Sequence, residues 1–324
     1  MNSAAMLLLA DPSPALRYRV LTELLDVAPS DAEAADLAAR RSHLPELDAL
    51  GRSGAGGLRA MSWTLCRLAF LGFGRELPLV RVIAERLLAH QADDGSFPLE
   101  EVRGGTGESR YSMIPLQVSL PLRGLAATGY ATDPRVERAY QWLLDQRLDD
   151  GAWPLGVAAG QPGYIAGYRR LPGSKGCRVN TEAAIACLVL HPERRRSDET
   201  RRALDLLLQR ETREEWSLGS EVMRLATTDE VPGFVTSYAR FDLAFVLELA
   251  SRAGASADDT RIRDLVAFLL AGRGREGLWE HPERPELGRW LTLELLLSLG
   301  RLAGGDWIGG APRLPFRALR RPRR

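Results

Sequence analysis

The stretch LLAHQADDGSF at residues 87–97 returns as LLDQRLDDGAW at residues 143–153. Each copy has a leucine-rich helix end, a glutamine, an acidic turn that closes on glycine, and an aromatic residue. Weaker copies occur at residues 209–216 and 272–279. The copies follow one another at roughly 55 to 65 residues, and self-similarity of this kind is the signature of a repeat architecture. We therefore expect one repetitive domain rather than two unrelated ones.

Two alternating sets of amphipathic segments lie between the repeated stretches. One set is apolar nearly all round, which predicts buried inner helices. It covers residues 14–26, 63–71, 116–128, 181–190, 242–250 and 292–299. The other set carries a charged face, which predicts outer helices, and covers residues 31–50, 80–90, 136–146, 199–209 and 262–270. Six inner and about five outer helices close a ring well, so the sequence predicts an all-α fold, specifically an α/α toroid, with a linear solenoid of helix pairs as the alternative.

Composition places limits on the class of protein. The expected toroid covers residues 1–303, and residues 304–324 form an Arg- and Pro-rich tail. The net charge of +1 gives no global field that favours nucleic acid. Three cysteines without a pairing pattern, and no apolar stretch long enough to span a bilayer, predict a cytoplasmic protein without stable membrane insertion. Lys175 is the only lysine, which is typical of a GC-rich, bacterial-type composition.

The repeated Gln-x-x-Asp-Gly-Ser/Ala-Phe/Trp phrase resembles the QW repeat of the terpenoid cyclase and protein prenyltransferase superfamily, which includes squalene cyclases. The resemblance covers about residues 14–303 and implies the α/α toroid. It also implies that the repeat glutamines and aromatics staple neighbouring helices together. These residues are Gln91, Gln146, Gln209, Phe97, Trp153, Trp216 and Trp279. A glutamine amide can bond to the backbone ends of a helix while an aromatic ring packs across the junction.

The catalytic motifs of that superfamily do not occur in this sequence. The Asp-x-Asp-Asp acid of squalene-type cyclases is absent, and none of the aspartate pairs is followed by the third acid that magnesium-dependent terpene synthases use. Prenyltransferases hold zinc with an aspartate two residues before a cysteine, but here Lys175 precedes Cys177 at that spacing. Cys177 and His281 could still meet in the fold, yet the sequence predicts no metal and no cofactor.

Long loops join each outer helix to the next inner helix, and such loops often carry function. The N-termini of the inner helices would converge at this end, where they favour an anionic group. The candidate ligand-binding residues lie in these loops or in the first turns after them: Arg110, Tyr111, Tyr168, Arg170, Tyr238, Arg240, Asp242, His281 and Trp290. The alternative is that caps such as Thr181 and Asp242 satisfy the helix ends, and that the arginines are solvated and the aromatics only pack within the loops.

Three residues are candidates for catalysis. Asp229 and Glu230 are adjacent carboxylates in a loop bounded by Pro232, and burial near apolar groups would make one of them a general acid. Cys177 precedes an inner helix, and a helix N-terminus can lower a thiol pKa enough to make a nucleophile. Solvated carboxylates and an inert buried thiol are the alternative interpretations.

Two classes of function remain open. The first is a terpenoid cyclase-like protein that binds an apolar, isoprenoid-like ligand with an anionic head in a central cavity, with or without a non-standard cyclisation or transfer reaction. The head would be a diphosphate or the carboxylate of an acyl acid. The second is a non-catalytic repeat scaffold that binds a protein or a small molecule at its loop-rich end. A deep cavity with apolar walls distinguishes the first class from the second.

Overall fold

The computed structural model describes residues 3–97, 114–154, 157–158, 161–162, 171, 173–209, 216–227 and 241–310. These residues are mostly helical, which confirms the all-α prediction. The α-helices are α1 (Ser3–Leu9), α2 (Pro14–Arg19), α3 (Ala32–Arg41), α4 (Glu46–Ser53), α5 (Leu58–Phe70), α6 (Pro78–Leu88), α7 (Ile114–Leu125), α8 (Pro134–Asp145), α9 (Arg178–Leu188), α10 (Asp198–Leu208), α11 (Ser220–Ala226), α12 (Leu243–Arg252), α13 (Thr260–Ala271) and α14 (Gly288–Leu302).

Short elements extend or connect these helices. The π-helical turns η1 (Val20–Leu24) and η2 (Ala126–Tyr130) continue α2 and α7, and 3-10 turns occur at η4 (Arg194–Arg196) and η5 (Pro285–Leu287). The strands β1 (Val157–Ala158) and β2 (Gln161–Pro162) pair antiparallel. The strands β3 (Trp216–Ser217) and β4 (Phe241–Asp242) pair in parallel. No helix of the described part is long and apolar enough to cross a membrane.

The helices differ in burial as their sequence patterns predict. Every residue of α9 is buried. Its neighbour α10 packs against it and buries only the face formed by Thr200, Ala203, Leu204 and Leu207. Such a narrow apolar face is typical of a helix with one side in solvent. The alternation of apolar and amphipathic segments in the sequence thus corresponds to a difference in depth.

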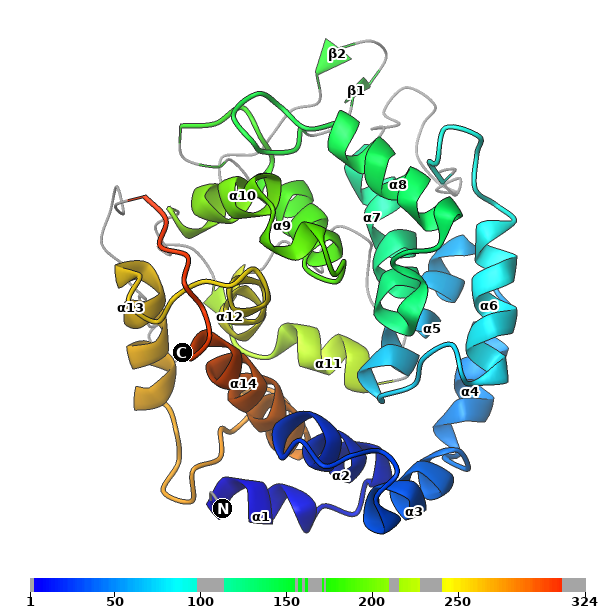
Figure 1. Ribbon diagram of the computed structural model, residues 1–324, viewed down its shortest axis with the longest axis vertical. Helices are drawn as coiled ribbons and strands as arrows, with labels where there is room; N and C mark the ends of the chain where they lie inside the picture. The colour runs from blue at the N-terminus through cyan, green and yellow to red at the C-terminus, as the bar shows by residue number, and fades with distance from the viewer. Residues whose placement is uncertain are drawn as a thin grey trace.

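Helices far apart in the chain lie side by side. Helix α5 packs against α7 and α7 against α9, while α12 packs against α14. The last helix, α14, also packs against η1 near the start of the chain, and the two lie together in the lower half of Figure 1. Leu16 and Val20 share a buried cluster there with Leu293 and Leu297. The two ends of the described chain are therefore joined by packing.

The outer helices begin at side chains that cap them. Asp133 accepts a 2.9 Å hydrogen bond from the backbone N–H of Arg135 at the start of α8. Asp259 accepts an equivalent 2.9 Å bond from Arg261 at the start of α13. Capping satisfies donors that have no partner within the helix. These aspartates therefore fix where the helices start.

Two tryptophans of the repeated stretch make the same pair of contacts. The indole of Trp153 donates a 2.7 Å hydrogen bond to the carbonyl of Leu143 at the end of α8, and its backbone N–H donates to the Thr181 hydroxyl in α9 at 3.0 Å. Trp279 repeats this arrangement with Leu269 of α13 at 2.7 Å and Thr292 of α14 at 2.9 Å. Each tryptophan therefore ties the end of one helix to the first turns of the next.

The glutamine and glycine of the first repeat connect α6 to α8. The Gln91 amide donates to the carbonyl of Arg135 at 2.9 Å and to that of Gly95 at 3.0 Å. Gly95 has a φ of 91°, and a side chain here would overlap the carbonyl oxygen of Arg138. The turn needs glycine both for its left-handed backbone and for the close approach of α8.

The structure differs from the expected elements in three places. The segment expected as one outer helix at residues 31–50 is two helices, α3 and α4, which are separated around Pro45 because proline cannot continue a helix. Helix α11 lies in a segment expected to be loop, at residues 217–236. Residues 304–310, expected to start the tail, form a strap that packs on the fold.

This C-terminal strap (residues 304–310) is held by backbone hydrogen bonds. Trp307 donates to Gly254 at 3.0 Å and accepts from Ser256 at 2.8 Å. The next glycines donate to carboxylates, Gly309 to Asp259 at 2.9 Å and Gly310 to Asp205 at 2.7 Å. The strap thereby connects the C-terminal end of the described chain to α10 and to the start of α13.

Candidate functional site

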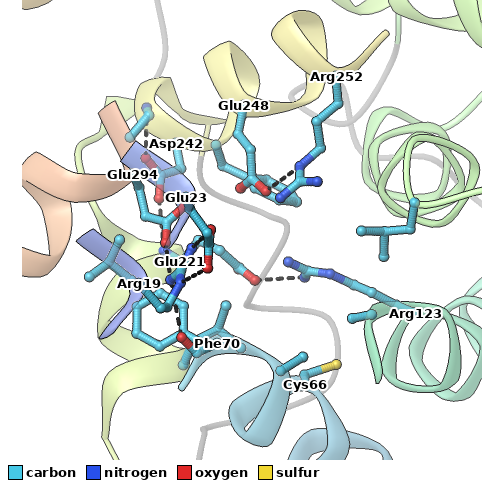
Figure 2. Close-up of a pocket in the computed structure, with 17 residues that line it drawn as sticks. Arg19, Glu23, Cys66, Phe70, Arg123, Glu221, Asp242, Glu248, Arg252 and Glu294 are labelled. Atoms are coloured by element: carbon cyan, nitrogen blue, oxygen red, sulfur yellow. Dashed lines mark hydrogen bonds and ion pairs between the residues drawn. The ribbon is translucent and has the colours of Figure 1, made fainter. Parts of the chain in front are cut away.

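A cavity of about 250 Å³ lies between helices from both ends of the chain, namely α2, α5, α7, α11, α12 and α14. We call it the interhelical cavity (Figure 2). One part of its wall is apolar and includes Phe70, Leu190, Leu225 and Phe245. The rest is formed by charged side chains that stand among apolar residues of these helices. Its size lies just below the usual range for small-molecule sites, roughly 300–1,000 Å³.

Arg19 organises one side of the cavity. Its guanidinium donates to both carboxylate oxygens of Glu23, at 2.6 and 2.8 Å, and to Oε1 of Glu294 at 2.6 Å. It also donates to the backbone carbonyl of Phe70 at 3.0 Å. Burial alone would lower the pKa of Arg19, but the carboxylates of Glu294 and Glu23 raise the pKa above its usual value. Arg19 is therefore permanently charged and bound on three sides.

The carboxyl groups of Glu294 and Glu248 face the same space, and their pKa values are shifted in opposite directions. Burial raises the pKa of Glu294, and the neighbouring carboxylates of Glu248 and Glu23 add to the rise. Burial acts in the same direction on Glu248, but Arg252 and Arg123 outweigh it and lower the pKa of Glu248. Arg252 donates through Nε to Glu248 Oε1 at 2.9 Å. Glu294 is thus the more readily protonated of the two.

Arg123 reaches into the cavity from α7, toward Glu221 of α11 (Figure 2). Nη1 of Arg123 lies 2.6 Å from Oε1 of Glu221, and the guanidinium carbon of Arg123 lies 4.9 Å from the centre of the Phe245 ring. Arg224 pairs with the same glutamate from one turn further along α11. Both side chains of the Arg123–Glu221 pair are buried, so the pair closes one end of the cavity with charge rather than with leucine.

Asp242 also lines the cavity, and its carboxylate holds two helices in place. Oδ1 accepts hydrogen bonds from Gly219 at 3.0 Å and Ala244 at 3.1 Å, while Oδ2 accepts from Glu221 at 2.8 Å. Burial raises the pKa of Asp242 to about 6, although the backbone N–H of Gly219 opposes the rise. The carboxylate therefore caps α12 and fixes the start of α11.

The other described candidates lie away from the cavity wall. Cys177 precedes α9 with its side chain fully buried in the main core, and its catalytic role stays a prediction. His281 is buried with both ring nitrogens engaged: Nε2 is 2.9 Å from the Gly219 carbonyl, and Nδ1 accepts the N–H groups of Glu283 and Arg284. Trp290 packs its ring 4.8 Å from that of Phe70, behind the cavity wall.

All eight remaining candidates lie outside the described residues. They are Arg110, Tyr111, Tyr168, Arg170, Asp229, Glu230, Tyr238 and Arg240. Their assignments as ligand-binding or catalytic residues stay predictions. Among the candidates that the structure describes, only Asp242 lines the interhelical cavity.

The sequence interpretation missed most of the charged residues that line this cavity. Glu294 stands in the run TLELLLSL, Arg123 in SLPLRGLA, and Glu248 in AFVLELAS. In each of these runs one charge stands among mainly apolar residues. Since charged residues are almost never fully buried without a partner, a lone charge of this kind indicates a partner from another helix. Such a lone charge in an apolar run is the sequence signal by which these cavity residues can be found.

Comparisons with solved structures give distant likenesses, of which two are described here. No family model and no curated protein matches the chain. A solved protein from Actinoplanes has 17% identity and a TM-score of 0.32, covering 75% of this chain and 90% of its own. A type II terpene cyclase from Scytonema, solved with its substrate geranylgeranyl dihydroxybenzoate, has 13% identity and a TM-score of 0.29, covering 75% of this chain and 86% of its own. At these TM-scores neither structure informs the function.

Proposed function

We propose that the protein is a terpenoid cyclase-like α/α toroid that binds a small amphiphilic ligand in the interhelical cavity. The ligand has an apolar, isoprenoid-like body and an anionic head. One observation carries the proposal: a single cavity places an apolar wall opposite charged side chains from several inner helices. The repeated QW-like phrase, together with the packing of α14 on η1, supports closure of the helices into a ring.

The apolar wall suits the body of such a ligand. Phe70 and Phe245 contribute ring faces, and Leu190, Val222 and Leu225 contribute branched side chains. Transfer of apolar surface from water to such a wall provides the driving force for binding. A cavity of about 250 Å³ favours a short chain over a polycyclic product.

Arg252 is the best-placed group for the anionic head. Its Nε is bound to Glu248, and its two terminal nitrogens have no hydrogen-bond partner among the described residues. A guanidinium edge of this kind binds a carboxylate through two parallel hydrogen bonds. Because glutamates crowd the same cavity, a singly charged carboxylate fits better than a diphosphate, which would meet them with several negative charges.

Ligand binding can be tested with a short series of probes. Octanoate and geranate should raise the melting temperature of the purified protein, whereas octanol and geraniol, which lack the charge, should raise it less. Substitution of Arg252→Gln should abolish the preference for the acids. Arg40→Gln is the matched control, because Arg40 is exposed and pairs with Asp36 on the surface of α3. If no probe changes the melting temperature and native mass spectrometry finds no co-purified lipid, the proposal is wrong.

That negative outcome would favour the alternative, a scaffold that binds a protein partner. Analysis of the same probe mixtures by mass spectrometry tests for turnover, since a cyclised or transferred product would differ from the added probe. A product would make the protein an enzyme and would direct attention to Asp229 and Glu230. A cytoplasmic location, predicted from the cysteine usage, is part of the proposal.

A further inference from the structure

Glu294 leaves one carboxylate oxygen available inside the interhelical cavity. Its Oε1 accepts from Arg19 at 2.6 Å, whereas Oε2 has no hydrogen-bond partner among the described residues. Glu23, which binds the same arginine, has both oxygens occupied, at 2.6 and 2.8 Å. Glu294 thus retains the capacity to accept a further hydrogen bond from inside the cavity, and in this it resembles Arg252, which retains the capacity to donate.

The charges around the cavity are already balanced. Five carboxyl groups line it, and all three lining arginines bind glutamates: Arg19 binds Glu23 and Glu294, Arg252 binds Glu248, and Arg123 pairs with Glu221. Arg224 pairs with Glu221 from outside the lining, and Arg301 lies within electrostatic reach of Glu248 and Glu294. The five carboxyl groups therefore face five guanidinium groups in all.

A balanced set of charges that is partly shielded from water restricts which ligands can enter. A ligand with only a carboxylate would add one uncompensated negative charge to a space of low dielectric constant. A ligand with only an amine would add one positive charge at a similar cost. A ligand that carries both charges leaves the balance unchanged and can engage the available groups of Arg252 and Glu294 together.

We infer that the ligand of the interhelical cavity is a zwitterionic amphiphile, with its carboxylate on the terminal nitrogens of Arg252 and its ammonium group on Oε2 of Glu294. This inference rests on the proposed function and narrows its ligand class from acids to amino acids with an apolar side chain. The ammonium donates to a carboxylate that Arg19 holds in place from the other side. Glu248 lies between the two ends, bonded to Arg252 and close enough to Glu294 to affect its titration.

Four probes with nearly the same chain separate the contributions: 2-aminooctanoate carries both charges, octanoate the negative one, heptylamine the positive one, and octanol neither. Isothermal titration calorimetry gives a dissociation constant for each. We expect 2-aminooctanoate to bind at least about tenfold more tightly than octanoate, as for one added charge-assisted hydrogen bond. Equal affinities of these two would overturn the inference and leave the proposed function standing, whereas binding of none of the four would remove both.

Two variants test the assignment to Glu294. Glu294→Gln should reduce the preference for 2-aminooctanoate over octanoate to about twofold or less, because a neutral amide attracts an ammonium group only weakly. Glu137→Gln is the matched control, since Glu137 is an ion-paired glutamate at His191 and Arg194, outside the cavity. A preference that survives in Glu294→Gln, with circular dichroism showing an intact fold, would place the ammonium elsewhere and overturn the assignment.

If Glu294→Gln fails to fold, a measurement on the unmodified protein tests whether the ammonium group contributes to binding. The preference for 2-aminooctanoate over its N-acetyl derivative, which keeps the carboxylate and lacks the positive charge, should also be at least about tenfold. An equal affinity for 2-aminooctanoate and its N-acetyl derivative would overturn the inference.

Discussion

Arg19 and Glu294, 275 residues apart in the chain, are joined by a hydrogen-bonded ion pair of 2.6 Å in the interior of the protein. The pair links α2 to α14 beside the cluster in which Val20 packs with Leu293. The pair therefore helps to join the two ends of the chain, and both of its residues also line the cavity.

Loss of this arginine should be severely destabilising. Arg19→Met leaves the buried Glu294 without its cation and removes the partner of the more exposed Glu23, and we expect the free energy of unfolding to fall by about 3–5 kcal/mol. Urea denaturation followed by circular dichroism measures this. Arg40→Met, at a pair whose side chains are 54% and 64% exposed, should cost less than about 1 kcal/mol. Equal losses in the two variants would show that the buried network does not stabilise the fold.

The repeat glycine should not tolerate a side chain. Gly95→Ala places a methyl group against the carbonyl oxygen of Arg138 at a φ of 91°, so we expect a loss of more than about 1 kcal/mol. Gly300→Ala is the control, because no atom lies within 4 Å of its added methyl group in α14. It should raise stability by roughly 0.5–1 kcal/mol. Thermal melts of both variants would reveal opposite shifts, and a stabilised Gly95→Ala would refute the role of the turn.

The indole N–H groups of the repeat should contribute equally at its two equivalent sites. Trp153→Phe and Trp279→Phe each leave a buried helix-end carbonyl without its donor, which should cost about 1–3 kcal/mol. Trp290→Phe, where the ring packs against Phe70, should cost less than about 1.5 kcal/mol. Chemical denaturation of the three variants gives the comparison. A cost at Trp290 as large as at the other two would mean that ring volume, rather than the hydrogen bond, matters.

Two capping aspartates should respond to pH in opposite directions. The pKa of Asp242 rises from 3.8 to about 6 on burial, so its contribution to stability is fully present below pH 3.8 and is lost as the pH rises through 6. The pKa of Asp259 is lowered, because the hydrogen bonds from Arg261 and Gly309 outweigh burial. Its contribution is present above pH 3.8 and is lost as the pH falls.

Urea denaturation between about pH 3 and 7, where these carboxyl groups titrate, tests both predicted pH dependences. The difference in free energy of unfolding between the unmodified protein and Asp242→Asn should decrease with rising pH. For Asp259→Asn the same difference should increase. Parallel trends in the two variants would show that the environment of Asp242 does not favour its protonated form.

The helices could be predicted from sequence because their signals are local. Apolar periodicity, Asp133 and Asp259 as caps, and the glycine of each repeated turn all act within a few residues. The contacts of Trp153 and Trp279 follow from the same repetition. Helix α11 escaped prediction because it is short and lies in a segment whose neighbours have no helical period.

The cavity could not be predicted in the same way, because its geometry is not local. Arg123 meets Glu221 and Arg19 meets Glu294 only after helices from different parts of the chain pack together. The candidates predicted from the sequence are mostly loop residues such as Arg110 and Tyr238, whereas the described cavity is lined mainly by helices, including α11. Within the described part of the chain, Asp242 is the one candidate predicted from the sequence that lines the cavity.

The C-terminal strap has a practical consequence for anyone who shortens this protein. A version that ends at residue 303, where the repeats end, would lose the N–H donors that Gly309 and Gly310 supply to Asp259 and Asp205. It would also remove the ring of Trp307, which lies 6.0 Å from the guanidinium of Arg261. A shortened version should therefore extend at least to Gly310 in order to keep these contacts.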